Sequence, residues 1–185
     1  IHGAHSDREY VYPLFYHYPE QKLSSAIGGY DFSGIPERWE AMEKARDLGV
    51  TVVSRRHSIL IDPLKRPGVA MITAVFDPFL PTRTTEEKRI ALKGFVISIF
   101  VIEEMIVEIM GDRFNLQFDL EIFETGKEDI SRISAEDLIY DEDLQPHALT
   151  GDEFPLVNLS MVNFGDHSWN LHFFPKTAIQ RDPFQ

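Results

Sequence analysis

The 185-residue sequence contains no cysteine, which excludes disulfide bonds, thiol catalysis and thiolate metal sites. It also has no long hydrophobic run. The longest nearly apolar stretch, Gly94–Ile102, ends at Glu103, well short of the roughly 20 residues that a membrane-spanning helix needs. The first residues are polar and lack the hydrophobic segment of a signal peptide. We therefore expect either a cytosolic protein or a piece of a longer chain.

Basic residues are scarce as well. The chain has 18 Lys and Arg against 30 Asp and Glu, a formal net charge of -12. Nucleic acids and anionic membrane surfaces both attract clustered Lys and Arg, so we expect neither as a partner. The apolar fraction of 43% is that of a folded globular protein. The length allows one large domain or two small ones.

The pattern of the first hundred residues predicts strands around a central helix. Ser33 is expected to cap a helix that has Pro36 in its first turn and ends at Gly49. A capping box of Thr84 and Glu87 predicts a second, short helix. β-Branched and aromatic runs predict the strands 11–17, 51–54, 58–61, 69–76 and 93–100.

The second part of the chain has a different pattern. A helix is predicted over 102–110, where apolar residues recur at helical spacing. Alternating apolar and polar residues predict a strand over 116–123. The acidic stretch 128–153 is expected to form a loop with one helical turn. A terminal hairpin is predicted around Gly165.

Motifs for catalysis or metal binding are absent from the sequence. It contains no phosphate-binding glycine loop and no G-x-S-x-G elbow. Two pairs of histidines, His2 with His5 and His167 with His172, lack acidic neighbours at the spacing of metal ligands. The acidic run EDLIYDEDL lacks the residue order of a calcium-binding loop. We therefore expect no metal, no cofactor and no enzymatic activity. By local chemistry alone, Asp31 forms an Asx-type turn or a favourable charge at a helix entry.

The order of several segments resembles the CHASE domain, the extracytoplasmic sensor module of histidine kinases, cyclases and plant cytokinin receptors. The segments that carry the resemblance are YPLFYHYP, GGYDFSGIPERWEAMEKARDLGVTVVS, PGVAMITAVF, LPTRTTEEKRIALKGFVISIF, IEEMIVEIM and VNFGDHSWNLHFF. Together they extend through nearly the whole chain.

The resemblance implies an α/β (α+β) fold of two tandem PAS-like units, each a mixed antiparallel sheet with flanking helices. Residues 1–101 would form the membrane-distal, ligand-binding unit, and residues 102–185 the membrane-proximal one. A linker helix would join the two units. The family's N-terminal helix and first sensor strand are expected upstream of Ile1.

The resemblance also implies a binding site. Asp31 stands where cytokinin-binding members carry a pocket Asp, and its spacing to Arg46 matches theirs. Val53 would supply main-chain hydrogen bonds to the ligand. The remaining lining residues would be Thr73, Ile97 and Ile99.

A carboxylate only accepts hydrogen bonds, which favours a purine-like or amine-bearing ligand. Thr73 and Ile97 depart from the residues of the cytokinin-binding members, so a different ligand class is expected. Ile97 in particular would narrow the cavity.

The function implied by the resemblance is that of a periplasmic or extracellular ligand-sensing domain of a transmembrane receptor. The parent protein would be a homodimeric histidine kinase or nucleotide cyclase such as a diguanylate cyclase. The alternative is a ligand-free dimerising spacer of the same receptor, which the bulk of Ile97 favours. A hydrolytic enzyme has no motif in its support.

Overall fold

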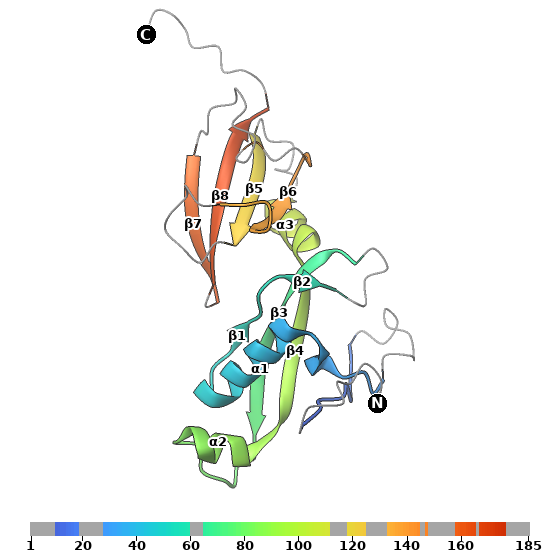
Figure 1. The fold of residues 1–185 in the computed structure, drawn as a ribbon, viewed down its shortest axis with the longest axis vertical. Helices are drawn as coiled ribbons and strands as arrows, with labels where there is room; N and C mark the ends of the chain where they lie inside the picture. Colours follow the sequence, from blue (N-terminus) through green and yellow to red (C-terminus); the bar gives the residue numbers. More distant parts are fainter. Residues whose placement is uncertain are drawn as a thin grey trace, which may run out of the picture. The chain divides into compact units, whose positions relative to one another are not determined.

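The chain divides into two compact units, Ile1–Val101 and Ile102–Gln185, each with its own antiparallel sheet (Figure 1). The computed structural model describes residues 10–18, 28–59, 65–111, 118–124, 133–144, 147, 158–165 and 167–176. Helices and two antiparallel sheets together confirm the prediction of an α+β fold.

The first unit is built around a long pair of antiparallel strands. In chain order, its elements are η3 (Phe32–Gly34), α1 (Pro36–Leu48), β1 (Val52–Val53), β2 (His57–Ser58), β3 (Pro67–Phe76), α2 (Thr85–Ala91) and β4 (Leu92–Val101). The long strand β3 pairs with β4 along one edge, and with the short strands β1 and β2 along the other.

The ends of α1 follow from local chemistry. Pro36 stands in the first turn, where its missing N–H is not needed. Gly49 ends the helix in a left-handed conformation, with φ 71°, and its N–H bonds to the carbonyl of Ala45. The predicted cap at Ser33 is wrong. Ile35 precedes the helix without a side-chain cap, and Ser33 belongs to the 3₁₀ turn η3.

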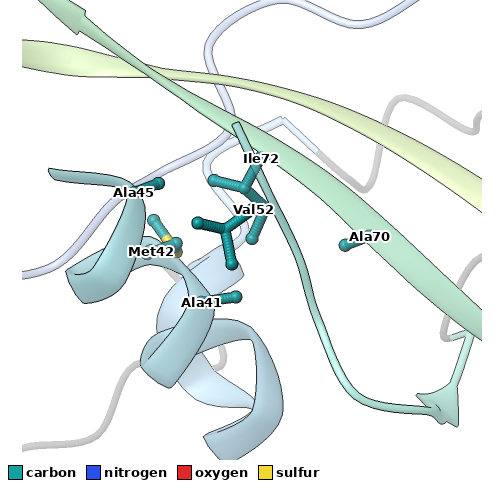
Figure 2. Close-up of a cluster of buried hydrophobic side chains, with 6 residues drawn as sticks. All are labelled: Ala41, Met42, Ala45, Val52, Ala70 and Ile72. Atoms are coloured by element: carbon teal, nitrogen blue, oxygen red, sulfur yellow. The ribbon is translucent and has the colours of Figure 1, made fainter. Parts of the chain in front are cut away.

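One face of α1 packs against β3 and forms the core of the first unit (Figure 2). Two alanines on α1 allow the helix backbone to come close to the sheet. The buried members are Ala41, Met42, Ala45, Val52, Ala70 and Ile72, and partly buried Tyr12, Phe95, Ile97 and Ile99 pack against them.

The connection between β3 and β4 is fixed to the end of α1. The capping box of Thr84 and Glu87 starts α2, as predicted. Lys88 Nζ then donates to the last carbonyls of α1, those of Asp47 and Leu48, at 3.2 and 2.9 Å. A cation at this end of a helix satisfies carbonyls that have no partner within the helix.

The elements of the second unit are α3 (Ile102–Met110), β5 (Phe118–Glu124), β6 (Leu138–Asp141), β7 (Asn158–Phe164) and β8 (His167–Pro175). The four strands form one sheet with the order β6-β5-β8-β7. The predicted helix 102–110 and the hairpin around Gly165 are both confirmed.

Two sequence-based predictions of secondary structure are wrong. The stretch 11–17 forms only an isolated bridge between Pro13 and Asp31, not a regular strand. The acidic stretch 128–153 contains the strand β6, which pairs with β5. Four residues with apolar side chains at their centre are enough for a strand when a neighbouring strand supplies the hydrogen bonds.

Candidate functional site

Asp31 is completely buried and ties two segments of the first unit together. Its Oδ1 accepts hydrogen bonds from the backbone N–H of Tyr12 at 3.1 Å and of Ser33 at 3.0 Å. The Ser33 hydroxyl donates to the same oxygen at 2.6 Å. Asp31 therefore caps η3 and holds the segment around Tyr12. This is the Asx-type arrangement that local chemistry predicts.

The side chains of Ile97 and Ile99 lie on the face of the sheet that α1 covers. Ile97 pairs with Ile72, and Ile99 pairs with Ala70, across the β3–β4 ladder. Paired residues of an antiparallel ladder lie on the same face. Both isoleucines accordingly pack against the buried core.

The other two predicted site residues lie elsewhere on the sheet. Thr73 pairs with Val96, which is 61% exposed, so Thr73 lies on the face opposite Ile97. Its hydroxyl is 2.8 Å from that of Thr51. Val53 lies in β1, paired with Met71, and is buried. The structure thus brings Ile97 and Ile99 together on one face of the sheet and places Val53 and Thr73 on the other face.

Three aromatic side chains, Tyr12, Trp39 and Phe95, also lie on the α1 side of the sheet, and the sequence did not predict them as site residues. The Tyr12 ring meets Phe95 edge-on, with centroids 5.1 Å apart, and lies 6.0 Å from the ring of Trp39. Burial raises the pKa of the Tyr12 phenol, although Arg46 acts in the opposite direction. All three rings are only partly buried. The sequence indicated only that Trp39 lies on the same helix face as Met42, three positions further along the chain.

A buried cation lies at the first turn of α1. Arg38 is 2% exposed, its guanidinium carbon lies 4.8 Å from the centre of the Phe32 ring, and its Nε donates to Nε2 of His57 at 2.8 Å. Nδ1 of His57 therefore carries the hydrogen, which points to the carbonyl of Arg55 at 3.0 Å. Burial lowers the pKa of Arg38 to about 10 and also lowers that of His57.

The first unit thus presents one helix-covered face where aromatic and aliphatic side chains meet, bordered by two buried polar groups, Asp31 and Arg38. Such a lining can bind a flat, largely apolar molecule and orient it by a few hydrogen bonds. Together with the second sheet, this arrangement defines an α+β protein of two units.

Comparison with protein families identifies the class to which the chain belongs. The CHASE domain model matches residues 1–140, well over half of the chain. The chain therefore belongs to the CHASE domain family, as its sequence segments indicated. A CHASE domain is an extracytoplasmic sensor module of signalling receptors and is not itself catalytic. No curated protein matches the chain. Among the described helices, none is both long and apolar enough to cross a membrane.

Proposed function

We propose that this domain senses a small molecule on the α1 face of the first unit and relays its binding to the rest of a transmembrane receptor. The observation that carries the proposal is the partly buried group of Tyr12, Trp39, Phe95, Ile97 and Ile99 on that face. Apolar side chains that their own core does not fully bury are the usual lining of a ligand pocket.

Two tandem PAS-like units are part of the proposal. Each unit has a four-stranded antiparallel sheet, and α1 covers one face of the first sheet. The residues 1–101 would face away from the membrane and bind the ligand, and the residues 102–185 would lie nearer to it. α3 would serve as the linker helix between them.

The proposed ligand is a flat, purine-like or amine-bearing compound. Aromatic rings stack on flat ligands, which supports a purine-like compound, whereas main-chain hydrogen bonds from Val53 to the ligand stay a prediction. Asp31 supports the site by holding Tyr12 in place. A direct bond from Asp31 to a ligand N–H stays a prediction. Thr73, on the opposite face of the sheet, is not part of the proposed pocket.

Ligand binding would act by population shift in a homodimeric receptor at the periplasmic or extracellular side of the membrane. A ligand changes the balance of two receptor states only by its difference in affinity for them. The output domain would be a histidine kinase or a nucleotide cyclase, in keeping with the family.

The test uses two neighbouring residues of β4 that lie on opposite faces of the sheet. A library of purines and small amines is screened by thermal shift, and each hit is titrated by calorimetry into wild type, Ile97→Phe and Val96→Phe. The added ring at Ile97 enters the proposed pocket and should weaken binding at least about tenfold, equivalent to roughly 1.4 kcal/mol. The same ring at Val96, which is 61% exposed, should leave the affinity unchanged. Equal affinities in the two variants would remove the α1 face from the site.

The second candidate function is a dimerising spacer without a ligand. The contact of Ile97 and Ile99 with the α1 core favours it, because these side chains occupy part of the space that a ligand would need. A screen without hits, combined with a stable dimer in light scattering, would support the spacer.

A further inference from the structure

Asp119 in the second unit is a buried carboxyl group without hydrogen bonds. It lies in the middle strand β5, paired with Phe174 of β8, and is 1% exposed. Within the described part of the chain, neither of its carboxylate oxygens accepts a hydrogen bond. An unpaired buried carboxylate is costly, so it either keeps its proton or has a cation beside it.

Two further metal-ligating side chains face Asp119. His147 Nε2 lies 4.0 Å from Asp119 Oδ2 and 3.5 Å from Asp143 Oδ2. One donor atom from each of the three residues lies within 4.8 Å of the others. The three come from separate parts of the chain: β5, the turn after β6, and a position beyond that turn.

The surrounding structure holds these side chains in place. The backbone N–H of His147 donates to a carboxylate oxygen of buried Glu121, and the His147 ring lies 5.4 Å from that of Phe174. The turn that carries Asp143 is fixed by Asp141, whose Oδ1 accepts the N–H of Asp143 and of Leu144 at 3.2 and 3.0 Å. Ligands positioned by such outer contacts are typical of metal sites.

The electrostatics around Asp119 also favour a cation. Burial raises the pKa of Asp119 to about 6, and the neighbouring charges of Asp143, Asp141 and Glu142 act in the same direction, whereas His147 acts against them. The residue of β8 that pairs with Asp119 is the uncharged Phe174, so it does not offset these charges. A divalent cation would compensate the negative charges of the two carboxylates, Asp119 and Asp143.

We propose that Asp119, Asp143 and His147 bind a divalent transition-metal ion. Ligand atoms of a tetrahedral Zn²⁺ site lie about 2.0–2.2 Å from the ion and hence about 3.3–3.6 Å apart. The 3.5 Å separation in this cluster already meets that value, whereas the 4.0 Å separation, and a third separation of up to 4.8 Å, need shifts of about half an ångström to about one ångström. The imidazole favours Zn²⁺, Ni²⁺ or Cu²⁺ over Ca²⁺ and Mg²⁺, which prefer oxygen ligands.

Metal binding would join the segment after β6 to the centre of the sheet and thereby stabilise the second unit. This site is separate from the proposed ligand face and does not depend on it. Three protein ligands leave one position of a tetrahedral ion open for water or an exogenous group.

The test is a calorimetric titration of Zn²⁺, and of Ca²⁺ for comparison, into the 185-residue chain at pH 7.5. The variants are Asp119→Asn and His147→Gln, both close in size to the native residue. The matched control is His167→Gln, which removes a histidine 3.6 Å from a carboxylate oxygen of Glu124 in the same unit. Circular dichroism of each variant reports whether it is folded.

Wild type and His167→Gln should bind one Zn²⁺ per chain more tightly than Ca²⁺. Asp119→Asn and His147→Gln should weaken Zn²⁺ binding at least about tenfold to a hundredfold, the loss typical of a disturbed metal site. Because metal ligands bind in their deprotonated forms, Zn²⁺ binding should also weaken as the pH falls. Co²⁺ absorption bands of a tetrahedral complex should appear in wild type and disappear in Asp119→Asn. Identical titrations and spectra for wild type and Asp119→Asn would overturn the proposal.

Discussion

Replacing Asp31 with alanine tests whether this residue is chiefly a structural support. The substitution removes the acceptor of three hydrogen bonds, two from backbone N–H groups and one from the Ser33 hydroxyl, at a fully buried position. Hydrogen bonds to a charged group contribute about 1.5–3 kcal/mol each, and losses that share one acceptor are less than additive. We expect Asp31→Ala to lower the free energy of unfolding by about 3–5 kcal/mol.

Urea unfolding followed by circular dichroism measures this loss, provided that the slope with denaturant is unchanged. Asp31→Asn keeps an oxygen at the Oδ1 position and should lose about 1–2 kcal/mol. The control is Asp77→Ala, which removes a hydrogen bond from the N–H of Phe79 and an ion pair with Lys93, both at the surface, and should change stability much less. An Asp31→Ala variant within about 1 kcal/mol of wild type would refute the structural role.

Three further predictions concern the first unit. Gly68→Ala should be strongly destabilising in urea unfolding, because the added Cβ would lie 2.4 Å from a backbone oxygen of β4; near-wild-type stability would contradict this packing. Burial lowers the pKa of His57, with Arg38 acting in the same direction and Glu37 against it. The His57 side chain therefore binds a proton more tightly in the unfolded state than in the folded state. The free energy of unfolding should keep its full value above about pH 6.5, the ordinary pKa of histidine, and should fall as the pH drops below that value. His57→Gln should reduce this slope in urea unfolding at several pH values. Thr84→Ala removes the α2 cap and should lower the free energy of unfolding by about 1 kcal/mol, and Thr84→Ser should restore most of it.

The elements that the sequence predicts correctly depend on residues close together in the chain. Pro36 and Gly49 mark the ends of α1, and Thr84 with Glu87 marks the start of α2. In each case the side chain acts on backbone groups within its own turn, so its effect can be inferred without knowledge of the fold.

The features that the sequence did not predict depend on contacts between distant residues. The strand β6 lies in an acidic run and was not predicted, because it is stabilised by pairing with the distant strand β5. In place of the strand predicted over 11–17, the structure has an isolated bridge between Pro13 and Asp31, next to the hydrogen bond from the Tyr12 N–H to Asp31. Thr73 lies in the same apolar strand as the core residue Ile72, but on the opposite face. Whether it shares a face with Ile97 depends on the register between β3 and β4, which the sequence did not predict.

The polar clusters were missed for the same reason. Arg38 meets His57 across 19 positions of the chain. His147 approaches Asp119 only because β5 and the turn after β6 lie next to each other. Asp143 and His147 are four positions apart in the sequence, but no sequence pattern connects either of them with Asp119.

The most direct test of the central claim is the affinity of a screened ligand for Ile97→Phe compared with Val96→Phe. We predict that the affinity falls at least about tenfold in Ile97→Phe and stays at the wild-type value in Val96→Phe. Wild-type affinity in Ile97→Phe, with the variant folded, would contradict a ligand site on the α1 face.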